Sequence, residues 1–264
     1  MNGRKNAVYA LVPAIAVALV AIGCYTETSP YEKTGPQPQS QPKLVPETIM
    51  HLGTSMAISG QVRAIDAGTG SPVKFDGDRS VSFLSLPPRP MNLGGSGSIA
   101  GGFLNFGIGA PASLALVPIR NVFGGYDSMY ESFSIVPAGA KGLAMKGLAT
   151  SGDGMNGWMH RMASHSDGPI STLDEVFYVY VNSDVVLAGR AKMVSGAGGI
   201  AIAEGTSMGL NAGWNAIHLK SVEIRSPDRF FQIVKMSAAD PDWVDWVIRE
   251  SGGMVESADF LLPR

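Results

Sequence analysis

The sequence has little cysteine, little charge and a single long apolar run. Only one of its 264 residues is a cysteine, Cys24, so no pair of cysteines within the chain can staple the fold. Charged residues make up 16% of the chain, below the usual quarter, and the formal net charge is −2. This balance lacks the basic stripe typical of nucleic-acid-binding proteins, so we expect a core-stabilised protein with no nucleic-acid partner.

The residues that are abundant favour a β-rich protein. Hydrophobic residues reach 45%, enough for a buried core, and 33 glycines and 17 prolines punctuate the chain. An alternation with a period of two places Met56, Ile58 and Val62 on one face of a predicted strand. We predict further strands at residues 81–86, 99–108, 114–119, 176–181, 185–188, 200–203, 214–224 and 230–236. The fold class is therefore all-β, with one or two β-sandwiches.

The long apolar run lies at the start of the chain. Arg4 and Lys5 precede it, residues 7–22 are nearly all apolar, and Ala21-Ile22-Gly23-Cys24 follows. This arrangement resembles the type II signal peptide of bacterial lipoproteins, in which small residues precede a cysteine that takes a diacylglyceryl group before cleavage. The resemblance covers residues 1–23 as signal and implies lipidation of Cys24. An uncleaved membrane anchor and an ordinary secretory signal are the alternatives.

A proline-rich stretch separates Cys24 from the predicted strands. Residues 24–50 carry Pro30, Pro36, Pro38, Pro42 and Pro46 among polar residues, a composition that predicts a disordered, semi-extended tether. Beyond it we expect an N-terminal sandwich half at residues 51–150, a polar loop at 151–171 and a C-terminal half at 172–264.

One helix is expected near residues 241–250. Asp240 is placed to cap it, Pro241 suits its first position, and Trp243, Val244 and Trp246 begin an apolar face. Between residues 94 and 98, Gly-Gly-Ser-Gly-Ser predicts a flexible hairpin tip.

Two stretches resemble known modules. Residues 58–62, followed by a glycine-rich turn and residues 80–86, resemble the opening hairpin of transthyretin-like sandwiches. Tyr178-Val179-Tyr180, residues 184–189 and residues 210–215 are similar to uncharacterised lipoproteins, for example of spirochaetes. These resemblances imply a transthyretin-like or immunoglobulin-like sandwich in the cell envelope, and they imply no activity.

Two motifs suggest chemistry without establishing it. Gly205-Thr206-Ser207-Met208-Gly209 has the form of a nucleophile elbow, but a strand rather than a helix is predicted after it. Catalysis by Ser207 therefore stays an alternative, that of a periplasmic hydrolase. Met155, Met159, His160, Met162 and His165 supply soft ligands that suit copper, provided that the side chains converge.

The expected function follows from the anchor rather than from any site. We expect a non-enzymatic structural, adhesive or ligand-binding module without a cofactor, held at a membrane through Cys24. Tyr25 follows the cysteine where inner-membrane retention would favour aspartate, so the outer membrane is the expected location.

Overall fold

The protein is built almost entirely from β-strands, which confirms the predicted all-β class. The computed structural model describes residue 46 and residues 48–66, 71–84, 92–152, 155–196, 199–227 and 229–250. The signal, Cys24 and the tether up to residue 45 lie outside the described residues. Residues Lys43–Arg264 form one compact unit. Within the described residues, no helix is long and apolar enough to cross a membrane.

Strands at one end of this unit form a closed ring. The hydrogen-bonded order β11-β5-β6-β7-β3-β20-β12 returns to its start because β11 also pairs with β12. Their bounds are β3 Met56–Ile65, β5 Arg79–Leu84, β6 Asn92–Ala100, β7 Phe103–Ile108, β11 Leu148–Gly152, β12 Met155–Asp167 and β20 Trp246–Glu250. Only β20 and β3 pair in parallel within the ring. Because the ring is closed, each of these strands has a hydrogen-bonded partner strand on both sides.

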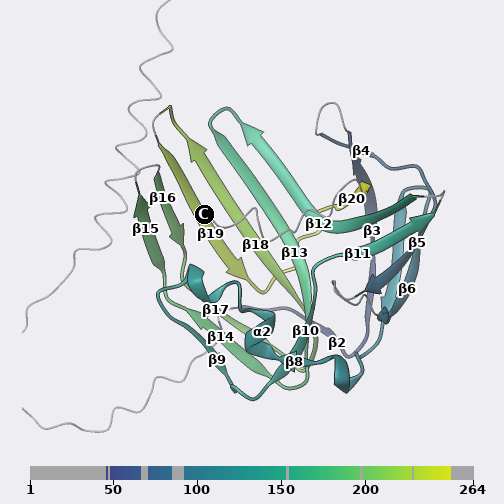
Figure 1. Cartoon of the computed structure of the whole chain (residues 1–264), viewed down its shortest axis with the longest axis horizontal. Helices are drawn as coiled ribbons and strands as arrows, with labels where there is room; N and C mark the ends of the chain where they lie inside the picture. The colour runs from purple at the N-terminus through teal and green to yellow at the C-terminus, as the bar shows by residue number, and fades with distance from the viewer. Residues whose placement is uncertain are drawn as a thin grey trace, which may run out of the picture. The chain divides into compact units, whose positions relative to one another are not determined.

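The same hydrogen-bonded sheet continues beyond β12 as an open extension. Its order is β12-β13-β18-β19-β16-β15, and Figure 1 shows these strands side by side. The bounds are β13 Ile170–Val181, β18 Gly213–Arg225, β19 Phe230–Ser237, β16 Gly199–Ala203 and β15 Lys192–Gly196. Shorter strands join at the margins: β2 His51–Gly53, β4 Pro72–Lys74, β8 Val117–Pro118 and β10 Lys141–Met145.

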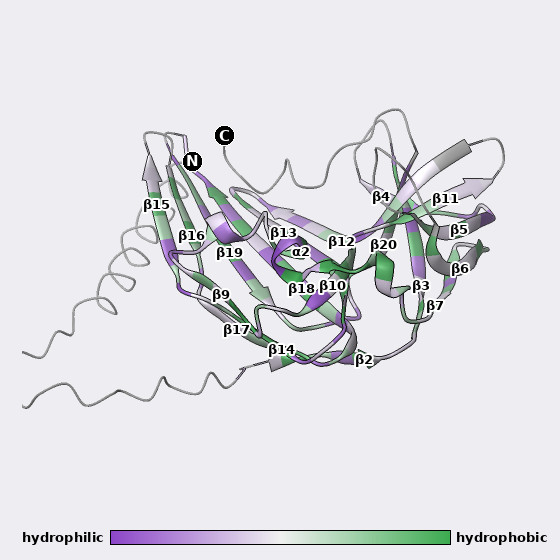
Figure 2. Ribbon diagram, turned by 60° about the horizontal axis from the view of Figure 1, so that its bottom comes forward, coloured by the Kyte–Doolittle hydropathy of each residue, from purple (hydrophilic) through white to green (hydrophobic). Residues whose placement is uncertain are grey.

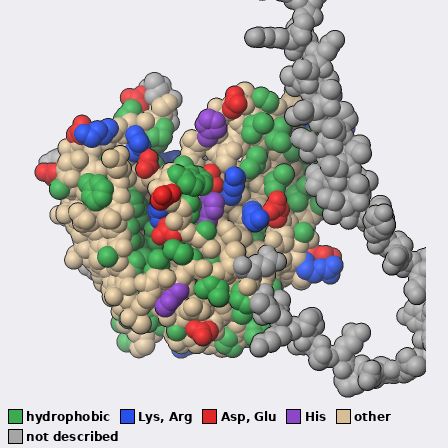
Figure 3. Space-filling view, turned by 180° about the vertical axis from the view of Figure 1, so that it is seen from behind, with side chains coloured by type: hydrophobic (Ala, Val, Ile, Leu, Met, Phe, Trp, Pro, Cys, Tyr) green, Lys and Arg blue, Asp and Glu red, His purple; other side chains and the backbone are tan. Residues whose placement is uncertain are grey.

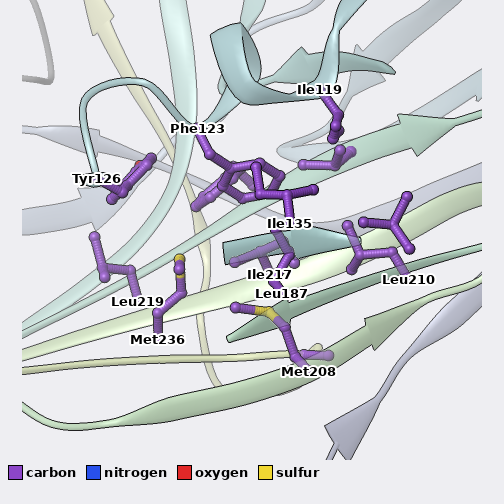
Figure 4. Packing of buried hydrophobic residues seen from close by; sticks show 14 of the residues in the cluster. Ile119, Phe123, Tyr126, Ile135, Leu187, Met208, Leu210, Ile217, Leu219 and Met236 are labelled. Carbon is purple, nitrogen blue, oxygen red and sulfur yellow. The ribbon is translucent and has the colours of Figure 1, made fainter. Parts of the chain in front are cut away.

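A second, four-stranded sheet packs against this extension. Its order is β1-β17-β14-β9, with bounds β1 Thr48–Ile49, β17 Thr206–Leu210, β14 Val185–Gly189 and β9 Phe133–Val136. A short helix, α2 (Ile119–Val122), and two 3₁₀ turns, η1 (Ser113–Ala115) and η2 (Asp127–Met129), complete the described elements. Figure 4 shows Phe123, just after α2, beside Ile135 of β9, with Leu187 and Ile217 of the two sheets next to them and with Ile119 and Tyr126 on either side in the same cluster. This packing of two sheets is the predicted sandwich.

Strands β13 and β18 serve two hydrophobic cores at once. Phe177, Val179 and Val181 face the core between the two sheets, whereas Val176 and Tyr178 belong to the core associated with the ring. Successive side chains of a strand point to opposite faces, so burial on both faces explains the continuous apolar run at 176–181. Figure 2 shows hydrophobic and hydrophilic bands following one another along the strands elsewhere in the sheet.

The predicted helix at residues 241–250 is wrong, because residues 246–250 form β20. Its apolar residues reach both sides of the strand: Trp246 and Ile248 enter the ring core, and Val247 is also buried. A strand buried on both faces carries the same unbroken apolar run as a buried helix, so periodicity alone could not separate them. The ladders of β3 and β12 on either side supply the hydrogen bonds that decide for a strand.

The polar loop predicted at residues 151–171 is also wrong. Of the residues described in this range, 151–152 end β11, 155–167 form β12 and 170–171 begin β13, and β12 and β13 are a hairpin. Ser164, His165 and Ser166 are exposed at its tip, so their polarity reflects exposure rather than a lack of regular structure. Of the predicted tether at residues 24–50, the structure describes only the last few residues, and there Thr48–Ile49 forms β1.

Three smaller predictions need correction. Residues 99–108 form the junction of β6 and β7 rather than one strand, because Gly101 and Gly102 turn the chain with φ of +55° and +77°. Residues 114–119 form parts of η1, β8 and α2 rather than one strand, and only Val117–Pro118 pairs with another strand, β10. The glycine-rich tip predicted at 94–98 lies inside β6, since Gly95 and Gly97 allow the strand to approach β7 closely.

Candidate functional site

The alternation of β12 separates the predicted metal ligands. Met159 is fully buried in the ring core. His160 and Met162 lie on the opposite face of the strand. His165 is on the same face as Met159 but near the exposed tip of the hairpin. The side chain of Met155 lies outside the described residues. The structure therefore brings His160 and Met162 to one face and does not bring Met159 or His165 to them. Among the described residues, no three His, Cys, Asp or Glu side chains gather as a metal-binding group.

Ser207 lies within a strand rather than at a strand-to-helix turn. It occupies β17, directly opposite Ala188 of β14. Met208 and Leu210 of β17 face the core between the two sheets. Ser207 lies between them in the alternation and therefore points to the opposite face of its sheet, away from this core. His218 is on the far face of the other sheet, because Ile217 and Leu219 of β18 face the same core. Two sheets thus separate this serine from the histidine nearest to it in sequence.

The densest polar cluster of the described residues surrounds Arg161 on β12. Its guanidinium donates to the Val244 carbonyl at 3.0 Å, to the Pro241 carbonyl at 2.7 Å and to the Tyr178 hydroxyl at 2.6 Å. It also forms an ion pair with Asp240. Arg161 and Asp240 are only 11% and 19% exposed, so the pair is largely shielded from water. This "Arg161 clasp" fastens residues 238–245, the segment between β19 and β20, across the sheet.

A histidine–aspartate pair lies beside the clasp on the same face. His218 of β18 and Asp174 of β13 are 2.8 Å apart, between Nε2 and Oδ1, and both side chains are largely buried. Trp243 meets the His218 ring edge-on at a centroid distance of 5.9 Å and is itself 54% exposed. The view from behind in Figure 3 shows acidic, basic and histidine side chains gathered among hydrophobic ones on this side.

The pair supplies two of the three residue types of a Ser-His-Asp catalytic triad. Ser237 of β19 lies directly across the ladder from His218, with Asp174 on the other side. Within the described residues, however, no hydrogen bond links the Ser237 hydroxyl to the His218 ring. The backbone amides of β13, β18 and β19 beside the pair belong to the ladders of these strands, so they are directed along the sheet rather than toward an oxyanion. The geometry suits a structural hydrogen bond better than proton transfer from serine.

A second set of ionisable groups lies on the opposite face of the sheet. Burial raises the pKa of Glu175, and the nearby charges of Lys146 and Arg249 only partly oppose this. Burial likewise lowers the pKa of Lys146, whose ammonium sits 5.2 Å from the centre of the Tyr126 ring. Burial also raises the pKa of Tyr130 to about 12. Desolvation dominates each of these shifts, so the interior penalises charge here.

His160 completes this second set. Its Nδ1 lies 3.2 Å from the Lys146 carbonyl, and burial lowers its pKa, an effect that the hydrogen bond to that carbonyl opposes. Arg249 approaches the sulfur of Met162 at 3.9 Å. A neutral imidazole beside a thioether suits a soft metal, but two ligands do not make a site. These groups hold the α2 segment, β12 and β13 together and form no convergent catalytic set.

Comparison of the chain with protein-family models, with curated proteins and with solved structures finds no match. The residues of the Arg161 clasp and the His218–Asp174 pair were not predicted from the sequence. Arg161 and Asp240 are 79 residues apart, and His218 and Asp174 are 44 apart. No local pattern marks such partners, because only the strand order brings them together.

Proposed function

We propose that this protein is a lipid-anchored cell-envelope protein whose β-sandwich body has a structural, adhesive or ligand-binding role without catalysis. The observation that carries the proposal is Ala21-Ile22-Gly23-Cys24 at the end of an apolar run that begins after Arg4 and Lys5. Cys24 is the only cysteine of the chain, which agrees with a cysteine kept for lipid attachment rather than for a disulfide.

The tether supports the same proposal. About 23 residues separate Cys24 from β1, and a proline-rich segment rises about 3 Å per residue, so it reaches up to about 70 Å. A body that begins at Thr48 would then stand clear of the headgroups. The outer membrane is the proposed location, and loss of the signal with Arg4 and Lys5 changes the formal net charge from −2 to −4.

The polar groups of the described residues favour a role without catalysis over an enzymatic one. Arg161, Asp240 and Tyr178 are occupied with one another, and Asp174 is occupied with His218. A hydrolase acting through Ser207 has less support, because the serine lies inside a ladder. Copper binding through the segment Met155–His165 has less support, because Met159 and His165 lie on the opposite face of β12 from His160 and Met162.

Metabolic labelling with a palmitate analogue tests the anchor. The wild-type chain is expected to take up label and to sediment with membranes. Cys24→Ala removes the thiol that would be acylated, so we expect no label and an uncleaved chain about 23 residues longer. Retention of label by Cys24→Ala would overturn the proposal.

Two substitutions next to the cysteine serve as controls. Ala21→Leu introduces the residue commonest at that position of such signals and is expected to keep labelling at the wild-type level. Gly23→Leu places a bulky side chain next to the cleaved bond and is expected to block processing although Cys24 is intact. Equal processing of the Ala21→Leu and Gly23→Leu variants would argue against a type II signal.

A further inference from the structure

Two cations and one carboxylate meet on the sandwich side of the large sheet without forming an ion pair. Glu175 is on β13, Arg249 is on β20 and Lys146 follows β10, and all three side chains are half-buried. Burial raises the pKa of Glu175, and the charges of Lys146 and Arg249 both oppose this rise, so both cations lie near the carboxyl group. Among the residues that the structure describes, however, none of the three forms an ion pair.

The register of the ladders places Arg249 and Glu175 on one face of the sheet. Arg249 lies opposite Trp158 of β12, and Glu175 lies opposite Met162 of the same strand. Residues 158 and 162 share a face because side chains alternate along a strand. Nη2 of Arg249 lies 3.9 Å from the Met162 sulfur, so the guanidinium extends along β12 toward Glu175.

Lys146 approaches the same face from the chain that follows β10. Its ammonium lies 5.2 Å from the centre of the Tyr126 ring and 5.9 Å from the centre of the Phe177 ring. Phe177 is two residues after Glu175 on β13, so the two side chains point to the same side. The rings replace part of the hydration that the ammonium loses, but they carry no net charge that would balance it.

Half-buried apolar side chains flank the three charges on this face. Trp158 and Met162 lie across the ladders from Arg249 and Glu175, and Leu173 precedes Glu175 by two residues on β13. None of the three apolar side chains belongs to either hydrophobic core of the described residues. Charged donors beside apolar surface are the usual composition of a small-molecule site. Lys146, Arg249, Glu175, Trp158, Met162 and Leu173 are together named the "cation cluster".

The charge of the cation cluster is unbalanced. Two cations face one carboxyl group, and burial disfavours the ionised form of that group. A half-buried charge without a counter-ion has lost hydration that nothing restores, and two neighbouring cations also repel each other. Unpaired polar groups of this kind commonly mark a place that an ion or a ligand completes. One anion bound between Lys146 and Arg249 would be a counter-ion to both.

We propose that the cation cluster binds a small organic carboxylate whose apolar body packs against Trp158, Met162 and Leu173. The two oxygens of a carboxylate can accept hydrogen bonds from a guanidinium and an ammonium group at the same time. A metal ion is disfavoured, because both cations repel it. This inference rests on the ligand-binding role within the proposed function and is independent of the lipid anchor.

Calorimetric titration of the purified full-length chain in mild detergent tests the site, with benzoate and hexanoate as probes. We expect saturable binding of one probe molecule per chain. Benzamide has the shape of benzoate without its charge, and acetate has the charge without the apolar body, so each is expected to bind at least tenfold more weakly. Failure of both benzoate and hexanoate to bind overturns the proposal. Equal binding of benzoate, acetate and inorganic phosphate would indicate an adventitious ion only and also overturns it.

Substitutions of the two cations locate the site. Lys146→Met and Arg249→Gln remove one charge each at nearly unchanged length, and each is expected to weaken benzoate binding at least tenfold. Lys235→Met and Arg225→Gln are the matched controls, because these cations are on the same sheet but form ion pairs at the surface. Equal losses in all four variants overturn the assignment. Circular dichroism spectra that match wild type exclude unfolding as the cause of a loss.

Glu175→Gln separates a site for an anion from a site for a ligand with an ammonium group. It removes the negative charge that would repel a carboxylate, so we expect benzoate to bind at least as tightly as to wild type. Loss of benzoate binding in this variant would show that the carboxyl group, rather than the cations, holds the ligand, and it would overturn the proposal. The titration does not depend on whether Cys24 carries lipid, so the site and the anchor can fail separately.

Discussion

At the residue scale, Arg161 illustrates how one side chain fixes a long segment. Its bonds to Asp240, to the carbonyls of Pro241 and Val244 and to the Tyr178 hydroxyl come from one planar guanidinium with several fixed donors. A lysine could satisfy only some of these acceptors. The segment 238–245 would otherwise cross the sheet with few bonds of its own.

Replacing Arg161 by alanine should cost about 3 kcal/mol of unfolding free energy, because it leaves Asp240 and two carbonyls without their partner in a shielded position. Arg63→Ala is the matched control. Arg63 binds Asp245 of the same segment at 2.6 Å, but the two side chains are 39% and 34% exposed, so we expect a loss below about 1 kcal/mol. Urea denaturation followed by circular dichroism measures both. Similar losses would contradict the role assigned to the clasp.

Glu175 gives a prediction about pH. Its pKa in the folded chain is raised above the unfolded value of 4.5 by burial, so the folded state holds the proton longer. The contribution of this pKa difference to the unfolding free energy is fully present below pH 4.5 and is lost as the pH rises through the folded pKa. Glu175→Gln removes the group whose ionisation causes this loss. We therefore expect the variant to be more stable than wild type at pH 8. The expected gain is about 1.4 kcal/mol for each tenfold decrease that burial causes in the acid dissociation constant of Glu175.

The check is the difference between the urea midpoints of Glu175→Gln and wild type from pH 4 to pH 8. The difference should shrink toward pH 4, where both side chains are neutral. A constant difference across this range would show that ionisation of Glu175 is not the cause. Glu223→Gln is the control, because Glu223 is on the same sheet but pairs with Arg225 at the surface.

At the element scale, close approach of neighbouring strands decides which residues the ring accepts. Gly97 of β6 is an example: a Cβ there would meet the Asn105 carbonyl and lie 2.7 Å from the Phe106 Cα in β7. Gly107 of β7 has open space around it. The sequence marks both only as glycines, and its local composition predicts a hairpin tip at 94–98, where the structure has a strand.

Gly97→Ala should therefore destabilise the protein by about 1–3 kcal/mol, because the strands must move apart to admit the methyl group. Gly107→Ala should change the unfolding free energy by less than about 1 kcal/mol, and in the stabilising direction, since it restricts the unfolded chain. Thermal denaturation of the two variants beside wild type measures this contrast. Tolerance of alanine at residue 97 would contradict the packing of β6 against β7.

Strand β20 shows why element type can escape sequence reasoning. Residues 241–250 contain a plausible cap, a proline and a dense apolar run, all of which also favour a helix. In the structure Asp240 pairs with Arg161 instead of capping, and Trp246 and Ile248 fill the ring core. The deciding factor is the space between β3 and β12, which residues far away in sequence create.

At the scale of the whole body, β12 and β13 tie the ring to the sandwich. Val176 and Tyr178 pack in one core and Phe177 and Val179 in the other, so neither core can open without loss of the shared strand. The predicted halves at 51–150 and 172–264 thus meet in one continuous sheet.

Unfolding should accordingly be a single transition in which both cores are lost together. Leu104→Ala in the ring core and Leu187→Ala in the sandwich core each remove a fully buried side chain. Each should cost about 2–5 kcal/mol and shift the same midpoint, seen alike by circular dichroism and by tryptophan fluorescence. Two separated transitions, each moved by only one of the variants, would show that the cores unfold independently.

The sequence by itself determined the all-β class and most of the long strands. The alternation around Met56 and the apolar runs at 176–181 and 214–224 each correspond to a strand, because side-chain period is a local property. It also supports the proposed anchor at Cys24, which depends on a short contiguous pattern. The resemblance to transthyretin-like sandwiches stays a prediction.

Only the tertiary structure decided the ring, the identity of β20 and the polar pairs. The ring depends on β20 pairing with β3, which lies almost two hundred residues earlier, roughly the separation between Trp246 and Val62. The Arg161 clasp and the His218–Asp174 pair form where strands from distant parts of the chain lie side by side. Local sequence encodes period and turn, whereas register between distant strands depends on which cores they can fill together.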